Sequence, residues 1–149
     1  MIIVYTDGAA KGNPGPGGYG TVMKFGEHRK EFSEGFRKTT NNRMELLAVI
    51  VGLEKLKSNK YPVTIFSDSK YVVDSVEKGW IWNWEKKGFK GKANVDLWKR
   101  FIPVYKRHNV KFKWVKGHAG IPENERCDEL AVAAAEGYSL KIDQGYENA

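Results

Sequence analysis

The chain opens on a strand-forming run, Ile2-Ile3-Val4-Tyr5-Thr6, which is followed directly by Asp7 and Gly8. Short runs of β-branched and aromatic residues are typical of buried strands. The later stretch Val63-Thr64-Ile65-Phe66-Ser67 repeats this pattern and is followed by Asp68. If the two predicted strands are neighbours in one sheet, both carboxylates lie at the same edge of that sheet.

Outward from these two strands, the sequence alternates between strand and helix patterns. Lys11–Gly18 is rich in Gly and Pro and predicts a loop. Asn42–Lys57 predicts a helix, because its apolar residues recur every three to four positions. Three strands followed by helix–strand–helix–helix–strand–helix predict an α/β fold, a mixed sheet with helices packed on its faces. The other predicted elements are strands at Tyr19–Phe25, Lys30–Phe36 and Val110–Val115, and helices at Ser69–Glu77, Asn94–Lys106 and Pro122–Glu136.

The length of 149 residues and the hydrophobic content of 41% are typical of one globular domain, residues 1–149. No apolar run is long enough to span a bilayer, and the N-terminus lacks the features of a signal peptide. Cys127 is the only cysteine, which fits a reducing compartment. We therefore expect a cytoplasmic monomer with no membrane association and no obligate protein partner. From about Tyr138 the tail is expected to be loosely ordered.

The charge of the chain is basic and unevenly distributed. Twenty-five Lys and Arg residues against eighteen Asp and Glu give a net charge of +7. Residues 80–116 hold eleven of the basic residues and only two acidic ones, Glu85 and Asp96. A basic region beside a mildly acidic remainder indicates a face for a polyanion and a separate site that uses carboxylates.

Four acidic residues at the ends of predicted strands or in predicted helices are candidates for that site, yet each has an ordinary structural explanation. Glu45 follows Asn42 by three positions, as in a capping box. Asp68 is placed to cap the next helix, and Asp7 to occupy a turn. Asp128 would fit a solvated helix face. Taken singly, none of the four identifies a site.

Together, the four carboxylates predict a metal site. Asp7 and Asp68 would share one sheet edge, a helix over that edge would add Glu45, and the last helix would add Asp128. Clustered carboxylates repel one another, and divalent cations remove that penalty. Oxygen-only ligands favour Mg²⁺ or Mn²⁺ over zinc, and such a site in a basic protein indicates phosphoryl transfer.

Five segments, in order from residue 5 to about 135, carry motifs of one family. They resemble type 1 ribonuclease H, which implies a ribonuclease H-like fold with a five-stranded mixed sheet, three antiparallel strands and then parallel ones. The segments are Thr6–Gly8 with Gly12–Gly18, Thr39–Leu46, Asp68–Val72, Asn94–Trp98, and Trp114–Gly120 with Pro122–Ala131.

The resemblance implies hydrolysis of the RNA strand of an RNA–DNA hybrid, leaving 5′-phosphate and 3′-hydroxyl ends. Asp7, Glu45, Asp68 and Asp128 would be catalytic and would bind two Mg²⁺ ions about 4 Å apart, with Mn²⁺ as a substitute. His118, in a Gly-His-Ala-Gly loop expected to be mobile, would act as a proton shuttle or aid product release. An exposed loop histidine without such a role is the alternative.

The resemblance also implies which residues contact the hybrid. Asn13, Asn41 and Asn42 would lie in the minor groove and sense 2′-hydroxyls, which distinguishes the RNA strand without reading bases. Thr40 and Asn94 would hold a phosphate of the DNA strand. The remaining expected substrate-binding residues are Lys38, beside that phosphate, and Tyr71, Trp80, Trp84, Lys86 and Lys87, along the DNA strand.

The segment Trp80–Lys92 mixes aromatic residues with lysines. One interpretation is a helix that packs Trp80 and Trp84 into the core. The other, from the resemblance, is a basic handle that grips the DNA strand. The segment departs from the family pattern in being short and in carrying Glu85, so weaker hybrid affinity is a hypothesis.

Two other functions compete with hybrid cleavage. A DNA-cutting nuclease of the same fold would lack Asn41–Glu45 and Trp114–His118 as they stand here. A catalytically inactive hybrid-binding module would gain nothing from four carboxylates facing phosphate. Cys127 is interpreted as a packed core thiol on the apolar face of the last helix.

Overall fold

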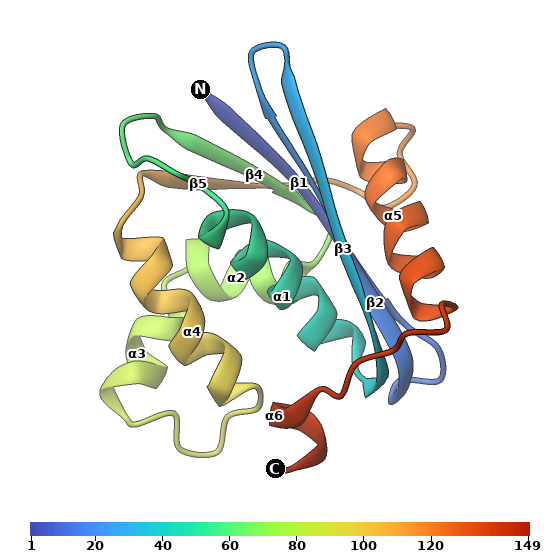
Figure 1. Ribbon diagram of the computed structural model, residues 1–149. Helices are drawn as coiled ribbons and strands as arrows, with labels where there is room; N and C mark the ends of the chain where they lie inside the picture. The colour runs from blue at the N-terminus through green and yellow to red at the C-terminus, as the bar shows by residue number, and fades with distance from the viewer.

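The computed structural model describes residues 1–149 and contains a five-stranded sheet with helices on both faces (Figure 1). The strand order is β3-β2-β1-β4-β5, with β1–β2 and β2–β3 antiparallel and β1–β4 and β4–β5 parallel. This confirms the predicted mixed sheet. The strands are β1 (Ile2–Ala10), β2 (Gly15–Phe25), β3 (His28–Thr39), β4 (Val63–Ser67) and β5 (Val110–Trp114).

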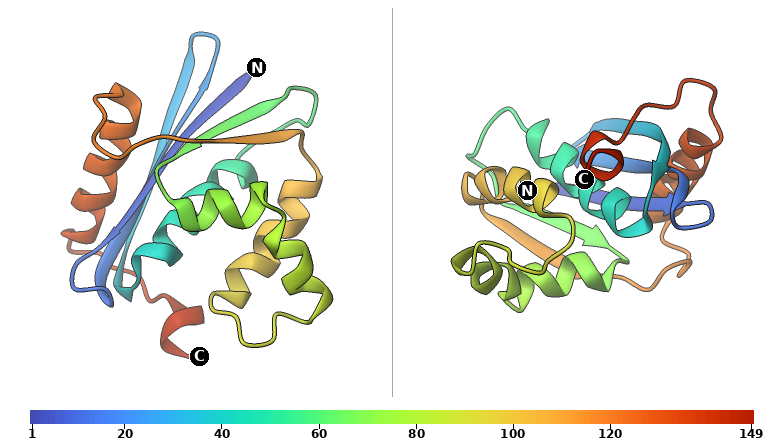
Figure 2. Two further views of the ribbon diagram at one scale, coloured as in Figure 1. Left: turned by 180° about the vertical axis from the view of Figure 1, so that it is seen from behind. Right: turned by 90° about the horizontal axis from the view of Figure 1, so that it is seen from below.

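The helices divide between the two faces of the sheet, as Figure 2 shows from two further directions. Helix α5 covers one face, against β1, β2 and β3, and the other long helices cover the opposite face. None of the helices has the length and apolar character needed to cross a bilayer. The helices are α1 (Asn41–Glu54), α2 (Lys70–Glu77), α3 (Trp80–Lys86), α4 (Val95–Lys106), α5 (Pro122–Ala135) and α6 (Gln144–Glu147).

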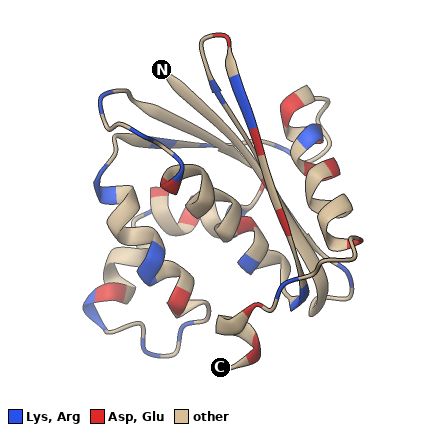
Figure 3. Ribbon diagram, in the orientation of Figure 1, with Lys and Arg blue, Asp and Glu red and all other residues tan.

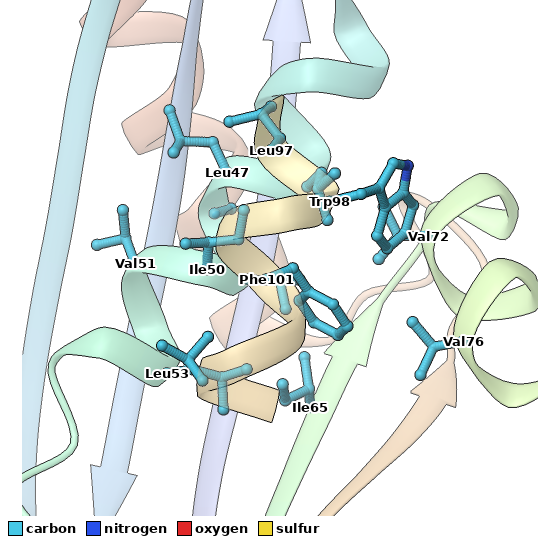
Figure 4. Close-up of a cluster of buried hydrophobic side chains, with 14 of the residues drawn as sticks. Leu47, Ile50, Val51, Leu53, Ile65, Val72, Val76, Leu97, Trp98 and Phe101 are labelled. Atoms are coloured by element: carbon cyan, nitrogen blue, oxygen red, sulfur yellow. The ribbon is translucent and has the colours of Figure 1, made fainter. Parts of the chain in front are cut away.

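The core lies between the sheet and helices α1, α2 and α4 (Figure 4). Helix α1 is buried without a break from Arg43 to Leu53, because the sheet covers one side and α2 and α4 cover the other. Trp98 of α4 is fully buried and packs edge-on against Phe101, at 5.5 Å between ring centroids. This packing fixes α1 firmly against β1, and α1 carries one of the candidate catalytic residues.

The first three strands are longer than the sequence pattern predicted. The expectation that the loop extends from Lys11 to Gly18 was wrong, because Gly15–Gly18 already belong to β2. A Cβ at Gly18 or Gly20 would collide with the backbone of α5. These glycines therefore let α5 pack directly on the sheet, and their lack of side chains was misread as a signal for a loop.

The tail beyond Tyr138 is also better ordered than expected. Lys141 pairs with Phe36 at the outer edge of β3, and α6 follows. Asp143 is only 7% exposed and accepts a hydrogen bond from the Thr39 hydroxyl at 2.6 Å. The expectation of a loose tail was wrong because Asp143 is anchored by Thr39 and Arg43, which lie 104 and 100 positions earlier in the chain, and local composition does not reveal such contacts.

Candidate active site

Three of the four candidate carboxylates meet at one edge of the sheet. Asp7 lies in β1, Asp68 directly follows β4, and Glu45 lies in α1. Each offers an oxygen atom, and these atoms all lie within 4.8 Å of one another. The parallel pairing of β1 with β4 places Asp7 and Asp68 at the same edge, as the two matching sequence stretches predicted.

Glu45 reaches this point because α1 crosses β1 closely at Gly8. A side chain at Gly8 would collide with the α1 backbone at Met44 and Glu45. The Gly8 N–H donates to Oδ1 of Asp7 at 2.9 Å and also to Oε1 of Glu45. One backbone group thus orients two carboxylates toward the same space.

The alternative explanations of Glu45 and Asp68 as helix caps were wrong. Helix α1 is capped by Thr40, whose hydroxyl accepts a hydrogen bond from the Arg43 N–H at 3.3 Å. Helix α2 is capped by Ser69, which accepts from Val72 N–H at 3.2 Å. Neither the Glu45 nor the Asp68 carboxylate therefore caps a helix.

The environment of Asp7 and Glu45 disfavours their negative charge. Burial, and then the charge of Asp68 and of Asp128, raises the pKa of Asp7 from 3.8 to about 7. Burial and the neighbouring Asp7 raise the pKa of Glu45 well above its usual value. Both shifts show that the protein alone does not compensate the clustered charge.

Glu45 supplies the clearest test of whether a cation fits here. Its side chain is buried, and its Oε2 atom has no hydrogen-bond partner. An unpartnered buried carboxylate oxygen is costly. Because Asp7 and Asp68 offer oxygens within 4.8 Å of one on Glu45, this carboxylate has the chemistry and position of a ligand for a hard divalent cation. The residues present fit such an ion.

Asp128 and His118 line an adjoining cavity rather than the three-carboxylate cluster itself. The cavity is also lined by Asp7 and Asp68, so the two groups share one space. Asp128 projects from α5, on the opposite face of the sheet from α1. His118 is exposed, in a left-handed backbone conformation with φ of 57°. Asp7 and Asp68 therefore line two neighbouring spaces, one shared with His118 and Asp128 and the other shared with Glu45.

Asn124 is a site residue that the sequence pattern did not single out. It lies four positions before Asp128 on α5, lines the same cavity, and has a buried amide oxygen without a partner. The spacing of four, which places two residues on one helix face, was the available signal. An unpartnered amide oxygen beside carboxylates adds a neutral oxygen donor to the cavity wall.

Several residues predicted to contact substrate are joined by hydrogen bonds near the start of α1. Asn13 accepts from the Asn41 N–H at 3.0 Å, and Asn41 in turn accepts from the Ala10 N–H. Asn94 donates to the Tyr71 hydroxyl at 3.0 Å. The remaining members at this end of the sheet are Lys38 and Asn42, both exposed, and the half-buried cap Thr40.

The basic segment forms α3 and the loop before α4, where blue segments predominate on the ribbon (Figure 3). Lys86 and Lys87 are exposed. The interpretation that Trp80 packs into the core was wrong, because Trp80 is 43% exposed and Ile81 takes the buried position. Trp84 is half-buried, 5.9 Å from the Trp98 ring, with Lys92 over its face.

Comparison with known proteins agrees with this arrangement. The family model RNase H matches residues 1–136. The chain belongs to the RNase H family. It is 59% identical over 147 residues to the ribonuclease H of Desulforamulus reducens, covering 95% of this chain and 92% of that protein. It is 55% identical over 151 residues to the ribonuclease H of Syntrophus aciditrophicus, covering 98% and 87%.

Solved structures of RNase H proteins share the fold. LC9-RNase H1, a type 1 RNase H with the type 2 active-site motif, superposes with a TM-score of 0.82 at 32% identity, covering 99% of this chain and 79% of that one. LC11-RNase H1 in complex with an RNA/DNA hybrid gives a TM-score of 0.73 at 27% identity, covering 91% and 97%. RNase H proteins use divalent metal ions, and the acidic cluster of this family member suits them.

Proposed function

We propose that this protein is a monomeric endoribonuclease that hydrolyses the RNA strand of RNA–DNA hybrids and leaves 5′-phosphate and 3′-hydroxyl ends. Two Mg²⁺ ions are the proposed cofactors, and Mn²⁺ is a possible substitute. The observation that carries the proposal is the cluster of Asp7, Glu45 and Asp68, with its unpartnered buried Glu45 oxygen.

Asp7, Glu45, Asp68 and Asp128 are the proposed ligands. When bound, divalent ions at such a site activate water and stabilise the charge that develops on the phosphate and the leaving oxygen. The protein's own part is to hold the four carboxylates in place before substrate arrives. The Gly8 N–H does so for Asp7 and Glu45, and a site fixed in advance needs no rearrangement during reaction.

His118 is proposed to move protons between the cavity and solvent. It is exposed, while Asp7, Asp68 and Asp128 in the same cavity are half-buried. Imidazole is the side chain that most readily accepts and releases a proton at physiological pH. Its place on a loop, rather than on a strand or helix, lets it approach and leave the reacting phosphate.

Selectivity for a hybrid is proposed to come from two separate contacts. Asn13, Asn41 and Asn42, at the start of α1, would lie in the minor groove and sense the 2′-hydroxyls of the RNA strand. The basic handle, defined here as residues 80–92, would bind the DNA strand through Trp80, Trp84, Lys86 and Lys87. Because it reads sugar and backbone, this arrangement is independent of base sequence.

A cleavage assay tests the proposal against its rivals. The protein is incubated with a labelled hybrid, duplex DNA and duplex RNA, with Mg²⁺ and with a chelator. We expect cleavage of the RNA strand of the hybrid alone, lost on chelation and in Asp7→Asn. Asp74→Asn is the matched control, because Asp74 lies on α2 and pairs with Lys78.

Each other outcome contradicts the proposal in a defined way. Cleavage of duplex DNA would identify a DNA nuclease of the same fold. Tight hybrid binding without cleavage, at any divalent ion concentration, would identify a binding module. Cleavage that survives both chelation and Asp7→Asn would show that the carboxylate cluster is not the catalytic centre.

A further inference from the structure

The C-terminal strap, defined as residues 138–149, connects the outer edge of the sheet to the region where substrate residues gather. The Lys141 N–H donates to Gly35 O and the Arg37 N–H donates to Lys141 O, each at 2.9 Å. Beyond this pairing, α6 lies beside the first turns of α1 and α4 (Figures 1 and 2). The strap thus ends at two helix starts, Asn41 and Val95, that are 54 positions apart in sequence.

Arg43 is the point at which the strap meets those helix starts. Its side chain is 4% exposed. Its Nε and one terminal nitrogen donate to the two oxygens of Asp143 in the strap, at 2.7 and 2.9 Å. Both terminal nitrogens donate to Asp96 in the first turn of α4, at 2.8 and 2.7 Å. One guanidinium therefore holds two carboxylates in fork geometry.

The same arginine contacts Thr40 and Asn94, the two residues that the resemblance to type 1 ribonuclease H implies hold a phosphate of the DNA strand. Its backbone N–H donates to the Thr40 hydroxyl at 3.3 Å, and its guanidinium lies 3.5 Å from the amide oxygen of Asn94. Asn94 has a left-handed φ of 62° and no side-chain capping bond to α4. Outside contacts therefore determine where its side chain points, and these are the Arg43 guanidinium and the Tyr71 hydroxyl.

We propose that Arg43 and Asp143 are positioning residues, which hold Thr40 and Asn94 at the separation that binds one phosphate of the DNA strand. This inference rests on the proposed function. Arg43 does not bind the phosphate itself, because it is buried and its donors are engaged by carboxylates. Asp143 keeps the guanidinium in one orientation, so the strap contributes to substrate binding without touching substrate.

A purely structural role for the strap is the competing explanation. Loss of a buried ion pair destabilises a protein wherever the pair lies. A positioning role predicts a more specific result. Loss of the ion pair must weaken the contact with one phosphate of the hybrid, while the rate at saturating substrate stays the same. Hybrids with a single neutral methylphosphonate, moved along the DNA strand, report on each phosphate separately.

The experiment compares wild type, Asp143→Asn and Asp96→Asn on this hybrid series, in the presence of Mg²⁺. Asp96→Asn weakens the ion pair of the same guanidinium on its exposed side. It replaces Asp143→Asn in the experiment if that variant does not fold. Glu147→Gln is the matched control, since it also removes a strap carboxylate from an ion pair, the exposed one with Arg37. Unfolding temperature is measured for every variant.

In wild type we expect one methylphosphonate position to weaken binding about tenfold, the size of one charged hydrogen-bond contact. Asp143→Asn and Asp96→Asn should raise KM on unmodified hybrid by a similar factor and leave kcat unchanged. In both variants, a methylphosphonate at that position should no longer weaken binding. Glu147→Gln should behave as wild type. Variants with lowered unfolding temperature but wild-type KM and profile would overturn the inference. Wild type that neither binds nor cleaves hybrid would instead overturn the proposed function.

Discussion

Replacing Asp7 by Asn should stabilise the metal-free protein at pH 8, although it abolishes the proposed activity. Asp7 has a pKa of about 7 in the folded protein against 3.8 for an unperturbed Asp. Because the folded-state pKa is raised, the folded state binds this proton more tightly than the unfolded state. Stability therefore falls as the pH rises from about 4 to about 7, and the penalty is fully present above pH 7.

The shift sets the size of the effect. A difference of about three pKa units corresponds to about 4 kcal/mol at most, since one unit is about 1.4 kcal/mol. Asp7 shares its environment with Glu45 and is partly solvated, which reduces the penalty to about 2–4 kcal/mol. For a chain of this length, the gain in unfolding temperature is then roughly 5–12 °C at pH 8.

Urea and thermal unfolding in chelator, followed by tryptophan fluorescence at pH 8 and pH 4, measure this difference. Asp7→Asn should be more stable than wild type at pH 8 and indistinguishable from it at pH 4. Added Mg²⁺ should stabilise wild type by more than it stabilises Asp7→Asn. The control Asp74→Asn should change stability by less than about 0.5 kcal/mol. A variant less stable than wild type at pH 8 would refute the argument that the cluster is strained without metal.

Three further predictions address the loop, the handle and the thiol. His118→Ala should lower kcat on the order of 10²-fold while hybrid affinity stays at the wild-type value, as measured by single-turnover kinetics and binding; an unchanged kcat contradicts the proton role. Glu85→Lys should tighten hybrid binding and steepen the slope of log K against log salt concentration by about 0.9. If the slopes of variant and wild type are equal, Glu85 does not lie in the interface with the hybrid. Cys127 should resist alkylation until urea unfolds the chain, because burial raises the pKa of its thiol.

The sequence predicted the elements of the fold better than their boundaries. Strand-forming runs located β4 and β5 closely, since both are short and rich in β-branched and aromatic residues, and β5 alternates these with lysines. β2 begins at Gly15, where no β-forming side chain is present. Two of its glycines, Gly18 and Gly20, are explained by a contact with α5, more than a hundred positions later in the chain, and local composition contains no trace of that contact.

In the candidate site, too, local sequence predicted some features and distant contacts determine the others. The motif positions predicted which carboxylates meet, and the register of β1 with β4 accounts for Asp7 and Asp68. Neither the capping of α1 by Thr40 nor the unpartnered oxygen of Glu45 follows from spacing. A capping-box pattern four residues long was present from Asn42 to Glu45, but the helix is capped two positions earlier, by Thr40, so Glu45 does not bond the cap.

The repulsion in the carboxylate cluster and the ordered strap are connected through helix α1. The cluster concentrates unfavourable charge, and an unsupported backbone would relax by moving the charges apart. Helix α1 prevents this, because it is buried along eleven successive residues from Arg43 to Leu53. Arg43, at the first of these, is tied to Asp143 and Asp96. The residues that hold the helix start in place thus also keep Glu45 where its charge is costly without a cation and useful with one.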